Sequence, residues 1–311
     1  MTATKTEDKD VYDVAIVGGG PAGLSAALWL ARYLHSVVLV DSGDPRNWET
    51  RGINGFLGSH GVKSPDLRKR GREDAEHFGA KLLSAIVDKV DNVNSERFVL
   101  TLQSGEAIQS RRLLLAIGIR DIWPRIAGLA DCYGETVHVC PDCDGYDAKD
   151  CKTVVVGAGR KAVGMALSLA NWTHEIVICT NGETPNIEPK HLDKLKALNI
   201  PVLDAKIEKV SSENREIRCV TLAGGMQLDC QRLFFAVGQY PADDLGAQLK
   251  CKRDDGGLIV IDDHYHTSVR NVFAAGDIVP GPQLAIAAAS DGAIAALAIH
   301  ASLIPESRQL D

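Results

Sequence analysis

The sequence predicts an α/β protein with two domains, the second of which is inserted into the first. An apolar run that leads into glycines and then into an Ala- and Leu-rich segment begins at Val11, and the same pattern begins again at Thr153. A further apolar run enters Gly276 ahead of an alanine-rich segment near the C-terminus, where it can close the first domain. A length of 311 residues agrees with two domains of ordinary size.

The first repeat reads as a complete βαβ unit. We expect a strand over Val11–Val17, a helix over Leu24–Leu34 and a buried strand over Val37–Val40, which ends in Asp41. The turn between the first strand and the helix reads Gly18-Gly19-Gly20-Pro21-Ala22-Gly23. This spacing after a strand and before a helix is typical of a Rossmann-like dinucleotide-binding domain.

Each residue type in this turn has a physical reason. Gly18 permits the tight turn, Gly20 lets the backbone approach a pyrophosphate, and Gly23 allows close packing of helix on strand. The helix N-terminus offers free N–H groups and a partial positive charge to the phosphates. Asp41 can accept hydrogen bonds from a ribose. We assign to this site Gly18, Gly20, Pro21, Ala22, Gly23, Asp41 and Ser42; the alternative is a glycine-rich turn without a ligand.

The second repeat keeps only part of the pattern. We expect strands over Thr153–Val156 and Glu175–Cys179, with a helix over Ala162–Ala170 between them. Its turn has glycines at 157 and 159, but Ala162 replaces the third glycine. A domain that binds NADPH usually presents basic residues after its second strand.

No arginine occurs in the segment directly after that second strand. The chain continues as Cys179-Thr-Asn-Gly-Glu183, and the next lysine in sequence is Lys190. We therefore expect a domain that no longer binds NADPH well. The alternative is an atypical nicotinamide site in which Arg160 and Lys161 contact the phosphates.

A cysteine pair lies between the two repeats. Cys140-Pro-Asp-Cys143 is followed by Asp144 and Gly145. Two thiols at this spacing can close a disulfide with little backbone movement, and CxxC geometry tends to lower the pKa of one thiol toward neutrality. A neighbouring carboxylate can relay the proton at each step. The pattern predicts a redox-active site, with Cys140, Cys143 and Asp144 as catalytic residues.

Other interpretations of these cysteines stay open. Cys132 and Cys151 lie close enough in sequence to form a Cys₄ zinc site with the CxxC pair, although a second CxxC is missing. A redox-inert flavoprotein that only binds partners is a further alternative. His138 either helps to polarise Cys140 or is a structural, hydrogen-bonded histidine. The other cysteines are expected in the core, at positions 179, 219, 230 and 251.

Composition limits the partners and the compartment. The net charge of -7 argues against a nucleic-acid binder. The basic cluster at Arg68–Arg70 and Arg72 reads as a solvated helix face, or else as a docking patch for an acidic protein. The first ten residues lack the apolar core of a secretory signal, and the alanine-rich tract Leu284–Ile304 reads as a buried helix rather than a membrane span. We expect a soluble, cytoplasmic protein with mostly reduced cysteines.

Several motifs carry a family resemblance. Asn271-Val-Phe-Ala-Ala-Gly276-Asp277 resembles the C-terminal FAD motif of two-dinucleotide-binding flavoproteins, with Leu115–Gly118 at the crossover. With Cys140-x-x-Cys143-Asp-Gly and Gly238-x-x-Pro241, the chain resembles the low-molecular-weight thioredoxin reductase family over nearly its whole length. That family has the two-dinucleotide-binding flavoprotein fold. The resemblance implies an FAD-binding domain over 10–118 and 247–311, and an inserted NADPH-domain-like domain over 119–246.

The same resemblance implies a mechanism and a site. Family members are FAD-containing homodimers that pass electrons from the flavin to the CxxC pair and on to thioredoxin. It implies that Cys143 faces the flavin and that Asp144 serves as the acid/base. Asn54 falls where the family has an FAD-contacting asparagine. The further cofactor-binding residues that it implies are Ala116, Gly118, Gly276, Asp277, Leu284 and Ala285.

The chain departs from the family in three places. Arg160-Lys161 replaces an Asp-Ser pair, a His-Arg-Arg cluster for NADPH has no counterpart after Cys179, and Gln283-Leu284-Ala285 replaces Arg-Gln-Ala. These departures point to the subgroup without the NADPH signature, in which ferredoxin or another donor supplies electrons. The string from Asp41 to Asn47 also resembles relatives that oxidise small dithiols with O₂. NADPH-dependent reduction of thioredoxin remains a further alternative.

Overall fold

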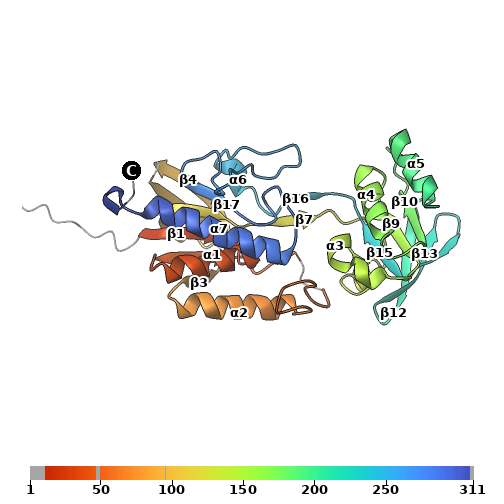
Figure 1. Ribbon diagram of the computed structural model, residues 1–311, viewed down its shortest axis with the longest axis horizontal. Coiled ribbons are helices and arrows are strands. Elements are labelled where there is room, and N and C mark those ends of the chain that lie inside the picture. Colours follow the sequence, from red (N-terminus) through yellow and green to blue (C-terminus); the bar gives the residue numbers. More distant parts are fainter. Residues whose placement is uncertain (1–10, 47–49, 95, 309–311) are drawn as a thin grey trace, which may run out of the picture. The chain divides into compact units, whose positions relative to one another are not determined.

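A computed structural model describes residues 11–46, 50–94 and 96–308. The chain forms two compact units, shown as ribbons in Figure 1. The first comprises Met1–Trp48, Ser64–Arg120 and Tyr240–Asp311, and the second comprises Glu49–Lys63 and Asp121–Gln239. The second unit thus includes a short segment that lies before Ser64, which the sequence pattern does not indicate. This unit ends at Gln239, and the domain boundary at 246/247 stays a prediction.

A seven-stranded sheet forms the centre of the first unit. Its strand order is β3-β2-β1-β6-β5-β4, and β17 also pairs with β6. Pairing is parallel among β3, β2, β1, β6 and β17, and antiparallel from β6 through β5 to β4. The strands are β1 Val11–Val17, β2 Val37–Asp41, β3 Lys81–Ser84, β4 Val87–Asn94, β5 Arg97–Leu102, β6 Ala107–Leu115 and β17 Val272–Ala274. Because β1 pairs with β2 on one side and β6 on the other, the chain order reverses beside β1, where open α/β sheets bind ligands.

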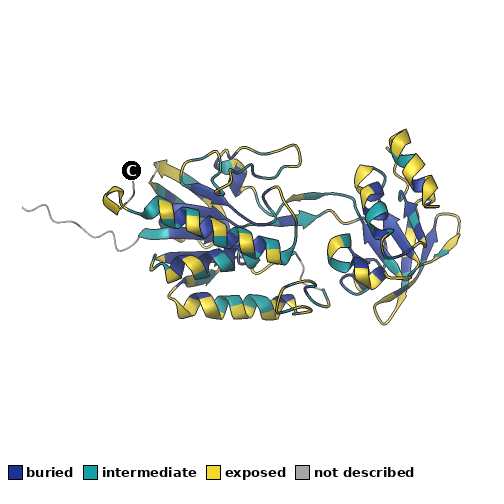
Figure 2. Ribbon diagram, viewed as in Figure 1, coloured by how far each residue is buried: buried dark blue, intermediate teal, exposed yellow. Residues whose placement is uncertain are grey.

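Helices cover one face of this sheet. They are α1 Pro21–Arg32, α2 Ser64–His77 and α7 Ala285–Leu303. Alternate β1 residues point to opposite faces, so Val14 and Ile16 pack with α1 and α7 while Ala15 and Val17 join the other core. That second core also takes in the short helix α6, Leu245–Gln248. Figure 2 shows the central strands as largely buried and the outer faces of the helices as exposed.

The helix α7 confirms a helix in the alanine-rich tract but corrects our expectation about its character. By length and composition it could cross a membrane, contrary to our expectation, and 28% of its most apolar 18-residue stretch is buried inside the protein. Its inner side packs closely on α1, because Gly292 brings the α7 backbone against Ala22. Length and apolar composition are weak evidence for a membrane span, since core helices of globular proteins share both.

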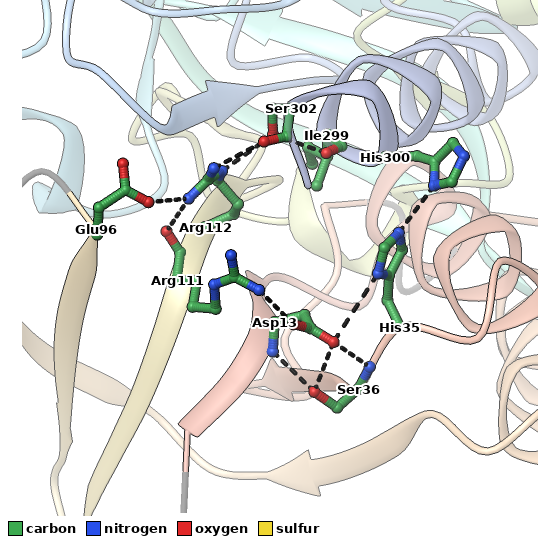
Figure 3. Close-up of polar contacts among 9 residues, drawn as sticks. All are labelled: Asp13, His35, Ser36, Glu96, Arg111, Arg112, Ile299, His300 and Ser302. Atoms are coloured by element: carbon green, nitrogen blue, oxygen red, sulfur yellow. Dashed lines mark hydrogen bonds and ion pairs between the residues drawn. The ribbon is translucent and has the colours of Figure 1, made fainter. Parts of the chain in front are cut away.

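The C-terminal end of α7 is held by polar contacts (Figure 3). The guanidinium of Arg112 on β6 donates to the Ser302 hydroxyl and carbonyl at 3.0 and 2.8 Å, and also to Glu96 at 2.9 Å. On the other side, His300 Nδ1 lies 2.9 Å from His35 Nε2. The C-terminal end of α7 is therefore tied to β6 and to the segment between α1 and β2.

The second unit has a smaller parallel sheet of order β11-β10-β9-β15-β8 and an antiparallel meander β12-β13-β14. The parallel strands are β8 Val137–His138, β9 Thr153–Val156, β10 Ile176–Cys179, β11 Val202–Leu203 and β15 Arg232–Phe235. The meander consists of β12 Ile207–Glu213, β13 Glu216–Leu222 and β14 Gln227–Asp229. The helices are α3 Pro141–Asp144, α4 Arg160–Leu169 and α5 Pro189–Ala197. The strands β7 Ile119–Asp121 and β16 Gln239–Pro241 pair with each other where the chain passes between units.

Candidate active site

The CxxC pair forms a disulfide in the second unit. Cys140 and Cys143 are bonded, with Cα atoms 5.3 Å apart, at the N-terminus of α3. Cys140 is the extended N-cap residue, and Pro141 starts the helix, where a missing N–H removes no hydrogen bond. The Cys143 N–H donates to Cys140 Sγ at 3.1 Å. A proline-initiated turn thus brings the two sulfurs together, as the spacing predicts.

The residue after Asp144 must be small. A Cβ on Gly145 would lie 2.5 to 2.9 Å from three ring atoms of Trp172. Such contacts are far closer than packing allows. The indole therefore lies directly against the turn that carries the disulfide, and this explains the glycine in the Cys-Asp-Gly string.

Asp144 is held by two side chains from other segments. Its Oδ2 lies 3.4 Å from Nδ1 of His138, and its Oδ1 accepts from the Asn54 amide at 3.3 Å. Asn54 Nδ2 also donates to the carbonyl of Cys143 at 3.1 Å. Asn54, which the resemblance assigns to the flavin, is thus brought beside the disulfide and Asp144. Its spacing from them in sequence gives no sign of this contact.

The other six cysteines are free thiols. Cys132, Cys179, Cys230 and Cys251 are buried as core residues, whereas Cys151 and Cys219 are half-exposed. Burial raises the pKa of Cys230 to about 12 and also raises the pKa of Cys179. Such thiols stay protonated and unreactive near neutral pH. Cys140 and Cys143, the two thiols shared by the zinc alternative, are bonded to each other, and the described part of the chain holds no cluster of three metal-binding side chains.

The first fingerprint is built as its glycines predict. Gly18 has a φ of 107°, and a Cβ there would overlap the carbonyl of Ala116 at the end of β6. A Cβ on Gly23 would overlap the carbonyl of Gly18. At Gly20, by contrast, no heavy atom lies within 4 Å of the position that a Cβ would take. The turn is closed on its protein side and open where a pyrophosphate would lie.

Asp41 stands beside this turn. It accepts from the backbone N–H groups of Gly19 and Gly43, both at 3.2 Å. It also pairs with Arg68 at 2.6 Å and with Arg72 at 3.2 Å. Ser42 next to it is exposed. The expected solvated face of α2 is therefore wrong for these two arginines.

A pocket opens between Asp41 and α2. Its volume is about 470 Å³. The lining is Asp41, Gly43, Pro65, Arg68, Lys69, Arg72, Glu73, Glu76 and Ser84. A concave site with an acid at the end of β2 is where the ribose of a dinucleotide lies in such folds.

The C-terminal motif meets the same edge of the sheet. Gly276 has a φ of 80°, and a Cβ there would lie 2.9 Å from the Cβ of Ala22 in α1 and 3.6 Å from the Cβ of Ala288 in α7. The Asp277 carboxylate pairs with Arg46 at 3.2 Å, and Arg46 also donates to Gln283 at 3.2 Å. This contact links the loop after β2 to the segment before α7, and our sequence reasoning missed Arg46.

The remaining predicted residues lie at the starts of two helices and in the loop after β6. Leu284 is the N-cap of α7, and Ala285 is its first residue. Pro21 starts α1. Gly118 has a φ of 69°, and its carbonyl accepts from Ala242 at 3.2 Å.

These features fit a bound FAD. The open backbone at Gly20, the α1 N-terminus without a side-chain cap and the acid at Asp41 suit a pyrophosphate and a ribose. Asp277 can accept from further hydroxyls. When bound, FAD supplies the electron pair for disulfide chemistry.

The second fingerprint has a different character. Arg160 and Lys161 are exposed at the start of α4. Beyond β10, Thr180 donates to the Asp204 carboxylate at 2.9 Å. The side chain of Lys206 begins beside Gly182, so a lysine lies near this loop that linear sequence reasoning missed. Lys206 is exposed.

Comparisons with known proteins assign the family. The pyridine nucleotide-disulphide oxidoreductase family matches residues 12–292. Thioredoxin reductase of Helicobacter pylori (strain J99) is 30% identical over 308 residues, which covers 93% of this chain and 98% of that protein. The chain belongs to the low-molecular-weight thioredoxin reductase family.

Solved structures agree with this assignment. A putative thioredoxin reductase TrxB from Bacillus anthracis superposes with a TM-score of 0.86 at 28% identity, covering 94% of this chain and 98% of that one. The structure of HlmI superposes with a TM-score of 0.90 at 33% identity, covering 96% and 94%. The fold is that of the two-dinucleotide-binding flavoproteins, as predicted, and the protein is a flavin-dependent, thioredoxin reductase-like disulfide oxidoreductase.

Proposed function

We propose that the protein reduces thioredoxin with electrons that its reduced flavin passes through the Cys140–Cys143 disulfide. The observation that carries the proposal is this disulfide with Asp144 directly beside it. A cysteine thiolate attacks the thioredoxin disulfide, a mixed disulfide forms, and the second thiol resolves it. Asp144 supplies the proton that the leaving thiolate takes up.

The flavin site that we propose lies in the first unit. The glycine turn and Pro21–Ala22 hold the pyrophosphate, and Asp41 and Ser42 hold the ribose. Ala116, Gly118, Gly276, Asp277 and the α7 start at Leu284 and Ala285 complete the site. Asn54 belongs to the second unit, and its role as a flavin contact is a separate proposal that rests on the family resemblance. Its side chain also donates to the Cys143 carbonyl at 3.1 Å.

We propose that the electron donor is not NADPH. Beyond β10 the Thr180 hydroxyl donates a hydrogen bond to the Asp204 carboxylate. A 2′-phosphate would need a cation in this part of the domain and not a carboxylate. Thioredoxin has a potential of about −270 mV, and about 30 mV of mismatch corresponds to about 1.4 kcal/mol for a two-electron couple. The donor must therefore be comparably reducing. Ferredoxin meets this requirement, as does another low-potential donor.

A turnover assay tests the proposal. Insulin reduction through thioredoxin is measured with NADPH and with reduced ferredoxin as donors. We expect turnover with ferredoxin and little with NADPH. Rapid bleaching of the flavin by micromolar NADPH in a stopped-flow instrument would reverse the order of donors and favour the site at Arg160, Lys161 and Lys206.

A second candidate function is the oxidation of small dithiols by O₂. The loop string that begins at Asp41 favours it, and Arg46 of that loop reaches the Asp277 carboxylate in the proposed flavin site. Asn47, the last residue of the string, lies outside the described residues. Oxygen uptake with dithiothreitol in the absence of thioredoxin tests this candidate.

The assembly and compartment are also proposals. We propose a homodimer, because α7 presents Ile286, Ile294 and Leu297 as exposed apolar side chains. We propose a cytoplasmic protein without nucleic-acid or membrane partners. Six free thiols beside one disulfide agree with a reducing compartment.

A further inference from the structure

His138 is a buried histidine that the chemistry above does not use. It ends β8, two residues before Cys140, and is 5% exposed. Its ring packs against Phe234 of the neighbouring strand β15, with centroids 5.1 Å apart. Its Nδ1 lies 3.4 Å from Asp144 Oδ2. Its Nε2 is buried and has no hydrogen-bond partner among the described residues.

A buried imidazole at this position lowers the stability of the fold, so we expect it to have a function. A buried polar atom without a partner lowers stability, and native proteins rarely keep one without a reason. The surroundings on β15 are aromatic, so an apolar side chain would fill the same space without that penalty. The carboxylate of Asp144 brings a polar atom within 3.4 Å of the ring.

Each oxygen of the Asp144 carboxylate has a side-chain contact. Asn54 donates to Oδ1, and His138 Nδ1 approaches Oδ2. Asn54 is also tied to the Cys143 carbonyl, so the three side chains and the disulfide form one connected group. The amide of Asn54 can only donate or accept a hydrogen bond, whereas the imidazole can also take up a proton.

We propose that His138 is a positioning residue that shares the proton of Asp144 during thiol–disulfide exchange. The imidazole Nδ1, 3.4 Å from Oδ2, holds the carboxylate in place and offers a nitrogen base for the proton that the exchange moves. The inference rests on the proposed exchange with an external disulfide or dithiol.

The exchange step balances with this pair as the proton store. A thiolate of the reduced CxxC attacks one sulfur of the partner disulfide, a new S–S bond forms, and the partner S–S bond breaks. The leaving thiolate takes the proton from the Asp144–His138 pair. In the reverse direction a partner thiol gives its proton to the pair as its sulfur attacks the Cys140–Cys143 bond.

The test is a double-mutant cycle on the FAD-loaded protein. The variants are His138→Asn, Asp144→Asn and the double variant. Asparagine offers an N–H near the position of Nδ1 but takes up no proton. The rate of reduction of the Cys140–Cys143 disulfide by dithiothreitol and the rate of thioredoxin reduction are followed by stopped flow from pH 5.5 to 9. His174→Asn, an exposed histidine of the same unit, is the control.

We expect His138→Asn to slow exchange by about tenfold or more, because general acid–base catalysis typically supplies about a hundredfold or more. We also expect it to change the pH dependence of the rate. The double variant should be no slower than Asp144→Asn alone, because both residues serve one proton. His174→Asn should match the wild-type protein.

Several outcomes would overturn the inference. Equal rates for His138→Asn and wild type at every pH would do so, as would effects that multiply in the double variant. His138→Ser replaces His138→Asn if that variant loses FAD or cooperative unfolding. Added imidazole must then raise the exchange rate of His138→Ser by filling the space left by the ring. A rate that imidazole does not change contradicts the proposal. A wild-type protein that exchanges with neither reagent refutes the proposed function itself.

Discussion

At the scale of single residues, the Asp41 carboxylate organises the nucleotide edge of the first unit. It is buried, and it accepts from Gly19 and Gly43 while it pairs with Arg68 and Arg72. The Arg68 guanidinium also donates to the Gly19 carbonyl at 3.3 Å. One arginine thus connects α2, the end of β2 and the phosphate turn.

We predict that Arg68→Gln destabilises the protein and weakens FAD binding. The change leaves a buried carboxylate with one fewer partner, which typically costs about 1–3 kcal/mol. Arg70→Gln, at an exposed arginine of the same helix outside the pocket lining, is the control. Urea unfolding and FAD titration of the apoprotein measure both effects. Arg68→Gln values that equal those of Arg70→Gln would show that the pairs to Asp41 are without consequence.

Residue types and local spacing predict much of the site, but contacts between distant segments escape them. The glycines at 18, 20 and 23 and the CxxC pair follow from local geometry, and the structure bears out that geometry. Asn54 beside Asp144 and Arg46 beside Asp277 depend on how loops fold back from elsewhere in the chain. A linear pattern holds no information on such pairs. The basic cluster on α2 misled us for the same reason.

At the scale of elements, the crossing of α1 and α7 fixes the two helices that begin at the proposed flavin site. The α7 backbone at Gly292 lies against the Ala22 backbone, and a Cβ at Gly292 would overlap the Ala22 carbonyl. A Cβ at Gly276 would in turn lie 2.9 Å from the Ala22 Cβ. Small residues on both helices therefore set how closely the helices approach.

We predict that Gly292→Ala destabilises the protein by about 1–3 kcal/mol through overpacking. Gly164→Ala in α4 is the matched control, because no heavy atom lies within 4 Å of its Cβ position. There the substitution should be neutral or stabilising by up to about 1 kcal/mol, since alanine favours a helix over glycine. Denaturant unfolding followed by circular dichroism measures both. Equal effects of the two substitutions would refute the close crossing.

The polar group at the end of α7 predicts a pH dependence of stability. Burial lowers the pKa of His35, and the nearby His300 and Arg111 lower it further, while Asp13 opposes the shift. The unfolded chain therefore binds a proton at His35 more readily than the folded one. This contribution to stability is full above about pH 6.5 and is lost as the pH falls below that value. Figure 3 shows the residues concerned.

We expect the free energy of unfolding to fall between pH 7.5 and pH 5.5, and to fall less in His35→Gln. His264→Gln, an exposed histidine of the same unit, should keep the wild-type slope. Urea unfolding at a series of pH values measures the slopes. A His35→Gln protein with the same pH dependence as wild type would contradict the assignment.

The predicted bounds hold for the first strand but not for the helix that follows it. The strand over Val11–Val17 is observed as expected. The helix expected over Leu24–Leu34 instead begins at Pro21 and ends at Arg32. Proline favours the first helical position, and Leu34 has a φ of 64°, which stops the helix. The membrane-like composition of α7 shows the reverse case, since composition alone does not distinguish a helix that packs on a protein from one that packs on lipid.

At the scale of the whole molecule, the exposed side of α7 predicts self-association. Leu297 is 50% exposed, and Ile286 and Ile294 of the same helix are also exposed. We expect a homodimer in solution and a shift toward monomer in Leu297→Asp, because a carboxylate in an apolar interface loses its hydration. Leu198→Asp, at an exposed leucine of the second unit, is the control. Sedimentation velocity measures the shift; a wild-type monomer would contradict the proposal.

The central claim is that the disulfide exchanges electrons with the bound flavin. Anaerobic dithionite titration of the FAD-loaded protein measures it, because flavin and disulfide each accept an electron pair. We predict that the wild-type protein takes up two electron pairs per flavin, with a thiolate–flavin charge-transfer band at the midpoint. Cys143→Ser should take up one pair. A wild-type protein that takes up one pair, with the Cys140–Cys143 bond still intact, would contradict the account.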